Sequence, residues 1–177
     1  MIRSVGGVRE IVRTLPWTYH DGGRDDAGFK GSAYGDCVCR AIAIGTGRPY
    51  VEVYGELADV GKTDRLTKRR SKKSHPRTGV YKPTIRRYLA ACGWSWTPTM
   101  GIGTGCRVHL AEGELPSGRL IVSVSKHITA VIDGVVYDTH DPCRDGSRCV
   151  YGYWCEPTSE ARALATTLNE AADELLK

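Results

Sequence analysis

The stretch from Lys126 to His140, KHITAVIDGVVYDTH, decides how this chain folds. Two runs of β-favouring residues flank Asp133-Gly134, a dipeptide typical of the type I′ turn in a two-residue hairpin loop. We therefore predict a β-hairpin in which Ile132 pairs with Val135 and the pairing continues outward from the turn.

Side chains alternate between the two faces of a strand, so this register divides the hairpin residues into two sets. The face predicted to be core carries Ile128, Ala130, Ile132, Val135, Tyr137 and Thr139. The opposite face carries His127, Thr129, Asp138 and His140. His127 and Asp138 are diagonal neighbours on that face, with Cβ atoms roughly 7 Å apart. This spacing predicts a hydrogen bond between imidazole and carboxylate.

A cysteine earlier in the chain is the expected third partner of this pair. Cys37 lies in the segment 35–45, GDCVCRAIAIG, where Asp36 is a good N-cap and the glycines near the end favour helix termination. A thiol at the first helical position lies in the positive end of the helix dipole, which favours the thiolate. Cys39 is a rival nucleophile, but it lies two residues further into the helix. Asp141 is a rival carboxylate, beyond the paired part of the hairpin.

The chain order Cys, His, Asp, with the cysteine on a helix and the other two on a hairpin, resembles the papain-like cysteine peptidase superfamily. The resemblance implies an α+β domain with helices packed on a small antiparallel sheet. It also implies a catalytic triad of Cys37 as nucleophile, His127 as proton carrier and Asp138 as the group that orients the imidazole. Peptide, isopeptide or amide bonds are then the expected substrates, and transglutaminase-like acyl transfer would use the same residues.

Several longer segments resemble a group of small uncharacterised bacteriophage proteins. These segments are DCVCRAIAIGTGRPYVEVY, GWSWTPTMGIGTGCRVHL, HITAVIDGVVYDTHDP and RCVYGYW. The resemblance spans roughly Trp17 to Trp154. One departure from papain-like enzymes concerns the oxyanion hole, because the sequence contains no Gln to donate a hydrogen bond there. The Cys37 backbone N–H remains as a donor, and the possible substitutes for the Gln are Lys30, Ser32 and Tyr34.

Composition indicates one soluble globular domain over residues 1–177, with 41% hydrophobic and 25% charged residues. Residues 1–16 are expected to form an N-terminal arm and residues 158–177 a C-terminal helix. Neither a signal-peptide pattern nor an apolar run of membrane-spanning length is found, so we expect a cytoplasmic protein without membrane contact. The seven cysteines are then expected to be reduced. No cofactor is predicted.

The remaining elements follow from local patterns. We expect helices at 49–61 and 83–92, a short helical turn at 110–115, strands at 94–96, 119–125 and 148–156, and a loop at 16–35.

The segment 62–77 is unlike the rest of the chain, because it has a net charge of +7 in a protein whose total is +5. Its basic residues are Lys62, Arg65, Lys68, Arg69, Arg70, Lys72, Lys73 and Arg77. So many charges cannot pack in a core, which predicts an exposed, mobile loop. The loop is either a solvated surface or a site for nucleic acid or an acidic protein, and in a non-catalytic protein it would carry the function.

Four possible zinc ligands lie close together in the sequence: His140, Cys143, Cys149 and Cys155. Their spacing lacks the paired Cys-x-x-Cys knuckles of common structural zinc sites, so we expect no metal centre there.

Overall fold

The computed structural model describes every residue except 1, 6–7, 12, 31–34, 69 and 158–177. The predicted C-terminal helix therefore lies outside the described residues, as do Ser32, Tyr34 and Arg69. The predicted hairpin is formed by β6 (His127–Ile132) and β7 (Val135–Asp138). Ile132 pairs with Val135, as expected. Asp133 and Gly134 have φ values of 47° and 78°, the left-handed conformations that a type I′ turn requires.

The hairpin is the middle of a six-stranded sheet with the order β3-β7-β6-β5-β8-β4. The other strands are β3 (Trp17–Tyr19), β4 (Ser95–Pro98), β5 (Arg119–Val124) and β8 (Val150–Cys155). The α+β class is confirmed, but the sheet is mixed and not antiparallel, because β3 pairs in parallel with β7. β3 lies within the stretch 16–35 that the sequence pattern predicts to be a loop. A strand of three residues is too short to show alternation, and long-range bonds such as Val136 N–H to Pro16 O (2.8 Å) fix it in place.

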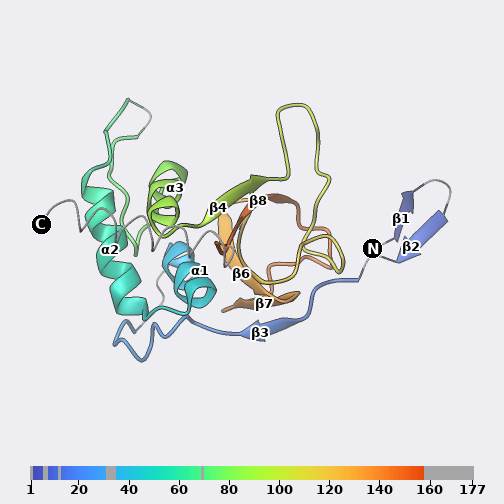
Figure 1. Cartoon of the computed structure of the whole chain (residues 1–177), viewed down its shortest axis with the longest axis horizontal. Helices are drawn as coiled ribbons and strands as arrows, with labels where there is room; N and C mark the ends of the chain where they lie inside the picture. The colour runs from blue at the N-terminus through green and yellow to red at the C-terminus, as the bar shows by residue number, and fades with distance from the viewer. Residues whose placement is uncertain (1, 6–7, 12, 31–34, 69, 158–177) are drawn as a thin grey trace, which may run out of the picture.

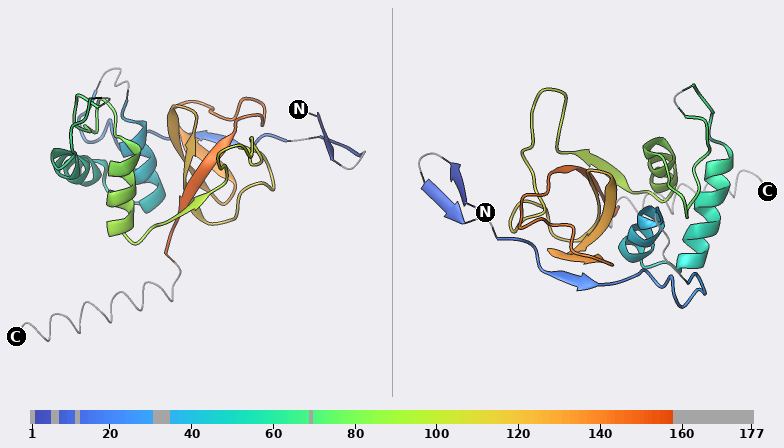
Figure 2. Two further views of the ribbon diagram at one scale, coloured as in Figure 1. Left: turned by 90° about the horizontal axis from the view of Figure 1, so that it is seen from above. Right: turned by 180° about the vertical axis from the view of Figure 1, so that it is seen from behind.

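Three helices cover one side of the sheet, as Figure 1 and Figure 2 show. They are α1 (Cys37–Thr46), α2 (Tyr50–Lys62) and α3 (Lys82–Ala91). α1 contacts both the sheet and α2, and α2 in turn contacts α3. Gly45 lies inside α1 and permits this close packing, because a Cβ there would come within 2.6 Å of Ile121 on β5. Gly47, with φ of 70°, ends the helix.

Both faces of the hairpin are buried, so the prediction of one core face and one polar face was wrong. Ile121 and Ile128 contribute to the core between sheet and helices, whereas Val131 and Val136 belong to a second core on the other side of the curved sheet. Val131 and Val136 share a face with His127 and are fully buried. Loops outside the central sheet, including the segment around Leu110, cover the second core. The alternation of residues within the hairpin could not show that these distant loops would bury its second face.

The rest of the chain contains two further departures from the sequence predictions. Residues 110–115 form turns and an isolated bridge instead of a helical turn. Cys106 and Cys149 form a disulfide, contrary to the expectation of reduced thiols, and their Cα atoms lie 5.8 Å apart, within the usual range for such a bond. The bridge from His109 to Cys149 brings the two segments together.

The N-terminal arm contains a separate hairpin of β1 (Ile2–Val5) and β2 (Val8–Ile11). Among the described residues, no helix is both long and apolar enough to cross a membrane.

The basic segment 62–77 is largely exposed, but a buried carboxylate anchors it. Asp64 accepts hydrogen bonds from the Ser74 backbone (2.9 Å), the Thr84 hydroxyl (2.6 Å) and the Arg87 guanidinium (2.7 Å). Burial alone would raise the pKa of Asp64, yet these donors hold it well below its ordinary value. The segment therefore has a defined attachment to α3, which its net charge did not predict.

Candidate active site

The structure brings His127 and Asp138 together at the open end of the hairpin. The distance from His127 Nε2 to Asp138 Oδ2 is 2.6 Å. Asp138 is 2% exposed, at the last position of β7, and His127 is the first residue of β6. Antiparallel pairing of the two strands places these positions at the same edge of the hairpin, as the register predicted.

Cys37 is the first residue of α1, and it lies close enough to His127 for the imidazole to lower the pKa of its thiol. Since Asp138 engages Nε2 of the imidazole, Nδ1 is the ring nitrogen left for the sulfur. The Ile128 backbone and the Arg40 charge also lower the pKa of the Cys37 thiol. Thus all three residues singled out in the sequence, from a helix and two strands, meet in one place.

The electrostatics of the three groups favour an ion pair between thiolate and imidazolium. Burial opposes ionisation of the Cys37 thiol, but the hydrogen bond and charge of His127 outweigh it, so the pKa of Cys37 is lowered. For His127, burial lowers the pKa, yet the bonds to Asp138 and Cys37 raise it to about 9. For Asp138, burial raises the pKa, but the hydrogen bond and charge of His127 and the charge of Arg40 outweigh it and lower the pKa to about 2. At neutral pH, Asp138 is ionised and His127 is charged.

A buried arginine that the sequence analysis missed holds the acid in place. Arg40 Nη1 donates to Asp138 Oδ1 at 2.9 Å, and Arg40 Nε donates to Asp36 Oδ1 at 3.0 Å. Asp36 occupies the predicted N-cap position but makes no side-chain capping bond. Its carboxylate instead accepts from Arg40 and, at 3.3 Å, from the Tyr50 hydroxyl. The only sequence signal was an Asp and an Arg four residues apart in an otherwise apolar helix.

The backbone of Asp138 is fixed by the parallel edge strand. Trp17 Nε1 and the His20 backbone N–H both donate to the Asp138 carbonyl, at 3.2 and 3.0 Å. Residues of α1 and His127 therefore hold the side chain of Asp138, whereas residues in and just after β3 hold its main chain.

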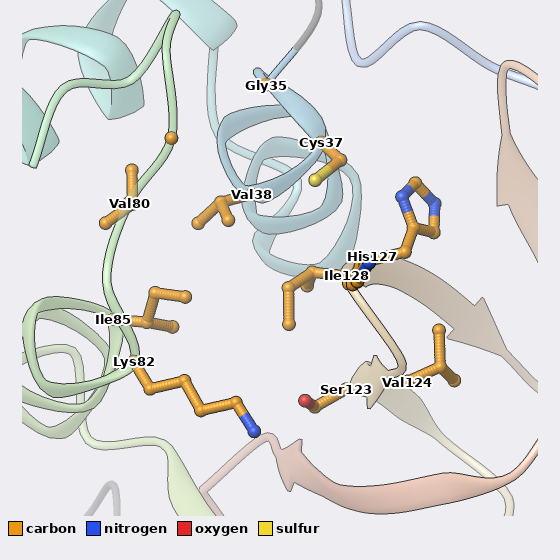
Figure 3. A pocket seen from close by; sticks show the side chains of 12 residues that line it. Gly35, Cys37, Val38, Val80, Lys82, Ile85, Ser123, Val124, His127 and Ile128 are labelled. Atoms are coloured by element: carbon orange, nitrogen blue, oxygen red, sulfur yellow. The ribbon is translucent and has the colours of Figure 1, made fainter.

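Cys37 and His127 line one end of a cavity of about 270 Å³ between α1, α3 and the sheet (Figure 3). Its walls are mainly apolar: Val38, Val80, Ile85, Val124 and Ile128. This volume is slightly below the range of about 300–1,000 Å³ typical of small-molecule sites, so it suits one or two side chains of a larger substrate. The sulfur is thus accessible from a cleft and not enclosed in the core.

The rival residues lie elsewhere. Cys39 is fully buried, donates to the Tyr50 carbonyl at 3.8 Å, and has a pKa raised to about 12, mainly by burial. Asp141 accepts a hydrogen bond from the Cys143 backbone at 2.8 Å, outside the triad. Lys30, a suggested oxyanion donor, is exposed.

A second thiol, imidazole and carboxylate cluster lies near the disulfide. Cys106 Sγ is 3.1 Å from His109 Nε2, and His109 Nδ1 is 3.1 Å from Glu114 Oε2. Because Cys106 is bonded to Cys149, this sulfur offers no thiolate.

The four possible zinc ligands of the sequence do not converge. Cys149 is in the disulfide, Cys143 donates to the Leu15 carbonyl, and Cys155 donates to the Ser95 carbonyl. Among the described residues, one group has metal-ligating atoms within 4.8 Å of one another, and it consists of His127, Asp138 and His140. The Arg40 guanidinium on Asp138 opposes a cation there, because it already supplies the positive charge.

No protein-family model, curated protein or solved structure matches this chain.

Proposed function

We propose that the protein is a thiol-dependent hydrolase of the cysteine peptidase type, which cleaves a peptide, isopeptide or amide bond with Cys37, His127 and Asp138. The observation that carries this proposal is that Cys37 and His127 line the same accessible cavity, while His127 is hydrogen-bonded to the buried Asp138 at 2.6 Å. A helix-tip cysteine facing an imidazole on a sheet also supports a papain-like arrangement.

In the proposed reaction, the Cys37 thiolate attacks the substrate carbonyl carbon, and the carbonyl π electrons move to the oxygen. The Cys37 backbone N–H and the positive end of α1 stabilise this oxyanion. When the tetrahedral intermediate collapses, the C–N bond breaks and His127 gives its proton to the departing amine. Water then attacks the thioester carbonyl while His127 accepts one of its protons. Collapse of this second tetrahedral intermediate breaks the C–S bond, releases the acid product and restores the thiolate and imidazolium. Asp138 fixes the imidazole orientation throughout.

The nucleophile is tested with an iodoacetamide probe at pH 7, with labelled sites quantified by peptide mass spectrometry. Cys92 and Cys155 are partly exposed free cysteines and serve as references within the same molecule. We expect Cys37 to be labelled about tenfold faster than either, because its thiolate is favoured. His127→Ala should remove that advantage while leaving the reference rates unchanged. Equal labelling of all three cysteines in the wild-type protein would rule out an activated nucleophile.

Transglutaminase-like transfer and hydrolysis differ in the molecule that accepts the acyl group, which is an amine in the first case and water in the second. A reactive acyl substrate is incubated with and without a primary amine. Hydrolysis yields the free acid in both cases, whereas transfer yields the amide when the amine is present.

The second candidate function is non-catalytic binding of nucleic acid or an acidic protein through the basic segment 62–77. The anchor at Asp64 favours it, because cations on an attached segment form a more defined surface than cations on a free loop. A mobility-shift assay with duplex DNA at several salt concentrations tests it. Binding that weakens steeply with salt, and is lost when Lys68, Lys72 and Lys73 are replaced by Met, supports this function. Wild-type protein that fails to shift DNA at low salt contradicts its nucleic-acid form.

A further inference from the structure

The cavity beside Cys37 is positively charged as well as apolar. Two lysines, Lys82 and Lys126, line it, and no carboxylate is found among the described residues of its lining. Lys82 is the first residue of α3, opposite the end where Cys37 lies, and Lys126 directly precedes His127. Anionic groups are therefore favoured in this cavity over cationic ones.

A second observation points to a polar ligand at the end away from the nucleophile. Ser123 on β5 is 1% exposed, and its hydroxyl has no hydrogen-bond partner among the described residues. A buried hydroxyl without a partner is uncommon in native proteins. Figure 3 shows the ammonium group of Lys82 and the hydroxyl of Ser123 directed toward the same part of the cavity. The Lys82 ammonium lies 5.2 Å from the centre of the Tyr151 ring, a contact that leaves its charge available.

The positive charge continues beyond the cavity. A neighbouring hollow of about 340 Å³ shares Gly79 and Val80 with it and is lined by Lys72 and Lys73 of the basic segment. An extended peptide leaving the cavity on this side would pass further lysines.

We infer that the cavity binds an acidic side chain of the substrate, so that the protein acts on an acidic peptide segment. This inference rests on the proposed function, because it names the substrate of the same site. The apolar walls contact the methylene groups of a Glu side chain, and Lys82 pairs with its carboxylate. We place the glutamate at the residue that supplies the scissile carbonyl, so that its side chain extends from the carbon attacked by Cys37 toward Lys82 at the other end of the cavity.

The test uses peptidyl acyloxymethyl ketones that differ only in the residue next to the ketone, which is Glu, Gln, Leu or Lys. The Cys37 thiolate displaces the acyloxy group, so a C–S bond forms, a C–O bond breaks and a carboxylate leaves. We expect the Glu probe to label Cys37 about five- to tenfold faster than the Gln probe at pH 7, a modest factor because Lys82 is exposed.

Three variants assign the preference to a residue. Lys82→Met removes the charge and keeps the length of the side chain, and it should abolish the preference for Glu. Lys82→Arg should keep it. Arg107→Met changes an exposed basic residue outside both hollows and outside the basic segment, and it should leave the preference unaltered.

Iodoacetamide labelling of the same proteins separates the two possible failures. Fast iodoacetamide labelling of Cys37 without any Glu preference, or with a preference that survives Lys82→Met, overturns the acidic substrate and leaves the hydrolase proposal standing. Slow labelling of Cys37 by every reagent overturns both.

Discussion

Arg40 donates a 2.9 Å hydrogen bond to Asp138, the residue whose other oxygen contacts His127. The same guanidinium contacts Asp36, directly before Cys37 in the chain. A network of buried charges therefore connects the start of α1 to the end of β7. Arg40 is not among the residues that line the cavity, so we regard it as a positioning residue.

Replacing Arg40 by Met should destabilise the protein by about 3–5 kcal/mol, because it removes the cation that the buried carboxylates of Asp36 and Asp138 share and leaves them only the cations Arg24 and His127, respectively. The free energy of unfolding is measured by urea denaturation. Arg40→Lys keeps the positive charge but cannot bond to Asp36 and Asp138 at the same time. It should lower the free energy of unfolding by less than Arg40→Met does. A change below about 1 kcal/mol for Arg40→Met would contradict the role of the network.

Arg40→Lys also tests positioning separately from stability. If Arg40 orients Asp138, the pH at which iodoacetamide labelling of Cys37 is half-maximal should rise in this variant. A role in stability alone would leave that midpoint unchanged while the free energy of unfolding falls.

Asp138→Asn should lower the pKa of His127 from about 9, because the hydrogen bond and charge of the carboxylate are the main influences that raise it. The imidazole can be followed by NMR titration of its ring protons. An unchanged His127 pKa in this variant would show that the contact with Asp138 is not electrostatically important. Asp141→Asn, which alters a carboxylate outside the triad, is the matched control.

The charged imidazole should also make stability depend on pH. The folded pKa of about 9 lies above the ordinary value of 6.5, so this stabilisation is complete below pH 6.5 and is lost as pH rises through 9. The comparison is made in a Cys37→Ser background, so that the thiol does not titrate. This change also removes the part of the rise in the His127 pKa that comes from Cys37 and leaves the part that comes from Asp138. There, the difference in unfolding free energy between His127 and His127→Gln proteins should shrink by about 1–2 kcal/mol from pH 6 to pH 9.5. A constant difference across that range would contradict a raised pKa.

Gly45→Ala should destabilise the protein by about 1–3 kcal/mol, because the new methyl group meets Ile121 at 2.6 Å. Gly55→Ala is the control, since a Cβ at Gly55 in α2 would meet nothing within 4 Å. That change should stabilise α2 by about 0.5–1 kcal/mol. Thermal melts of both variants give the comparison, and equal effects at the two sites would mean that α1 is not closely packed on β5.

The sequence was sufficient to predict the hairpin and the residues that meet at its open end. The reason is local: Asp133-Gly134 determines the turn, and the turn determines which side chains share a face. The position of Cys37 at the start of a helix was also predictable, because Asp36 and the glycines after the apolar run mark the ends of that helix. These signals involve neighbours in the chain and need no knowledge of distant contacts.

The features that were missed depend on distant contacts. Arg40 looks like a surface residue until Asp138, 98 residues later, is placed beside it. β3 has three residues and gains its bonds only from β7. The disulfide joins cysteines 43 residues apart, and no spacing rule connects them.

The separation between α1 and the hairpin also sets the order of events when the chain is made. A polypeptide synthesised only as far as the three helices contains Cys37 but neither the imidazole nor the acid that favours its ionised form. The sulfur therefore stays an ordinary, weakly reactive thiol until strands from the last third of the domain dock. If Cys37 is the proposed nucleophile, its activation therefore comes at the end of folding, which spares neighbouring molecules from a reactive nascent chain.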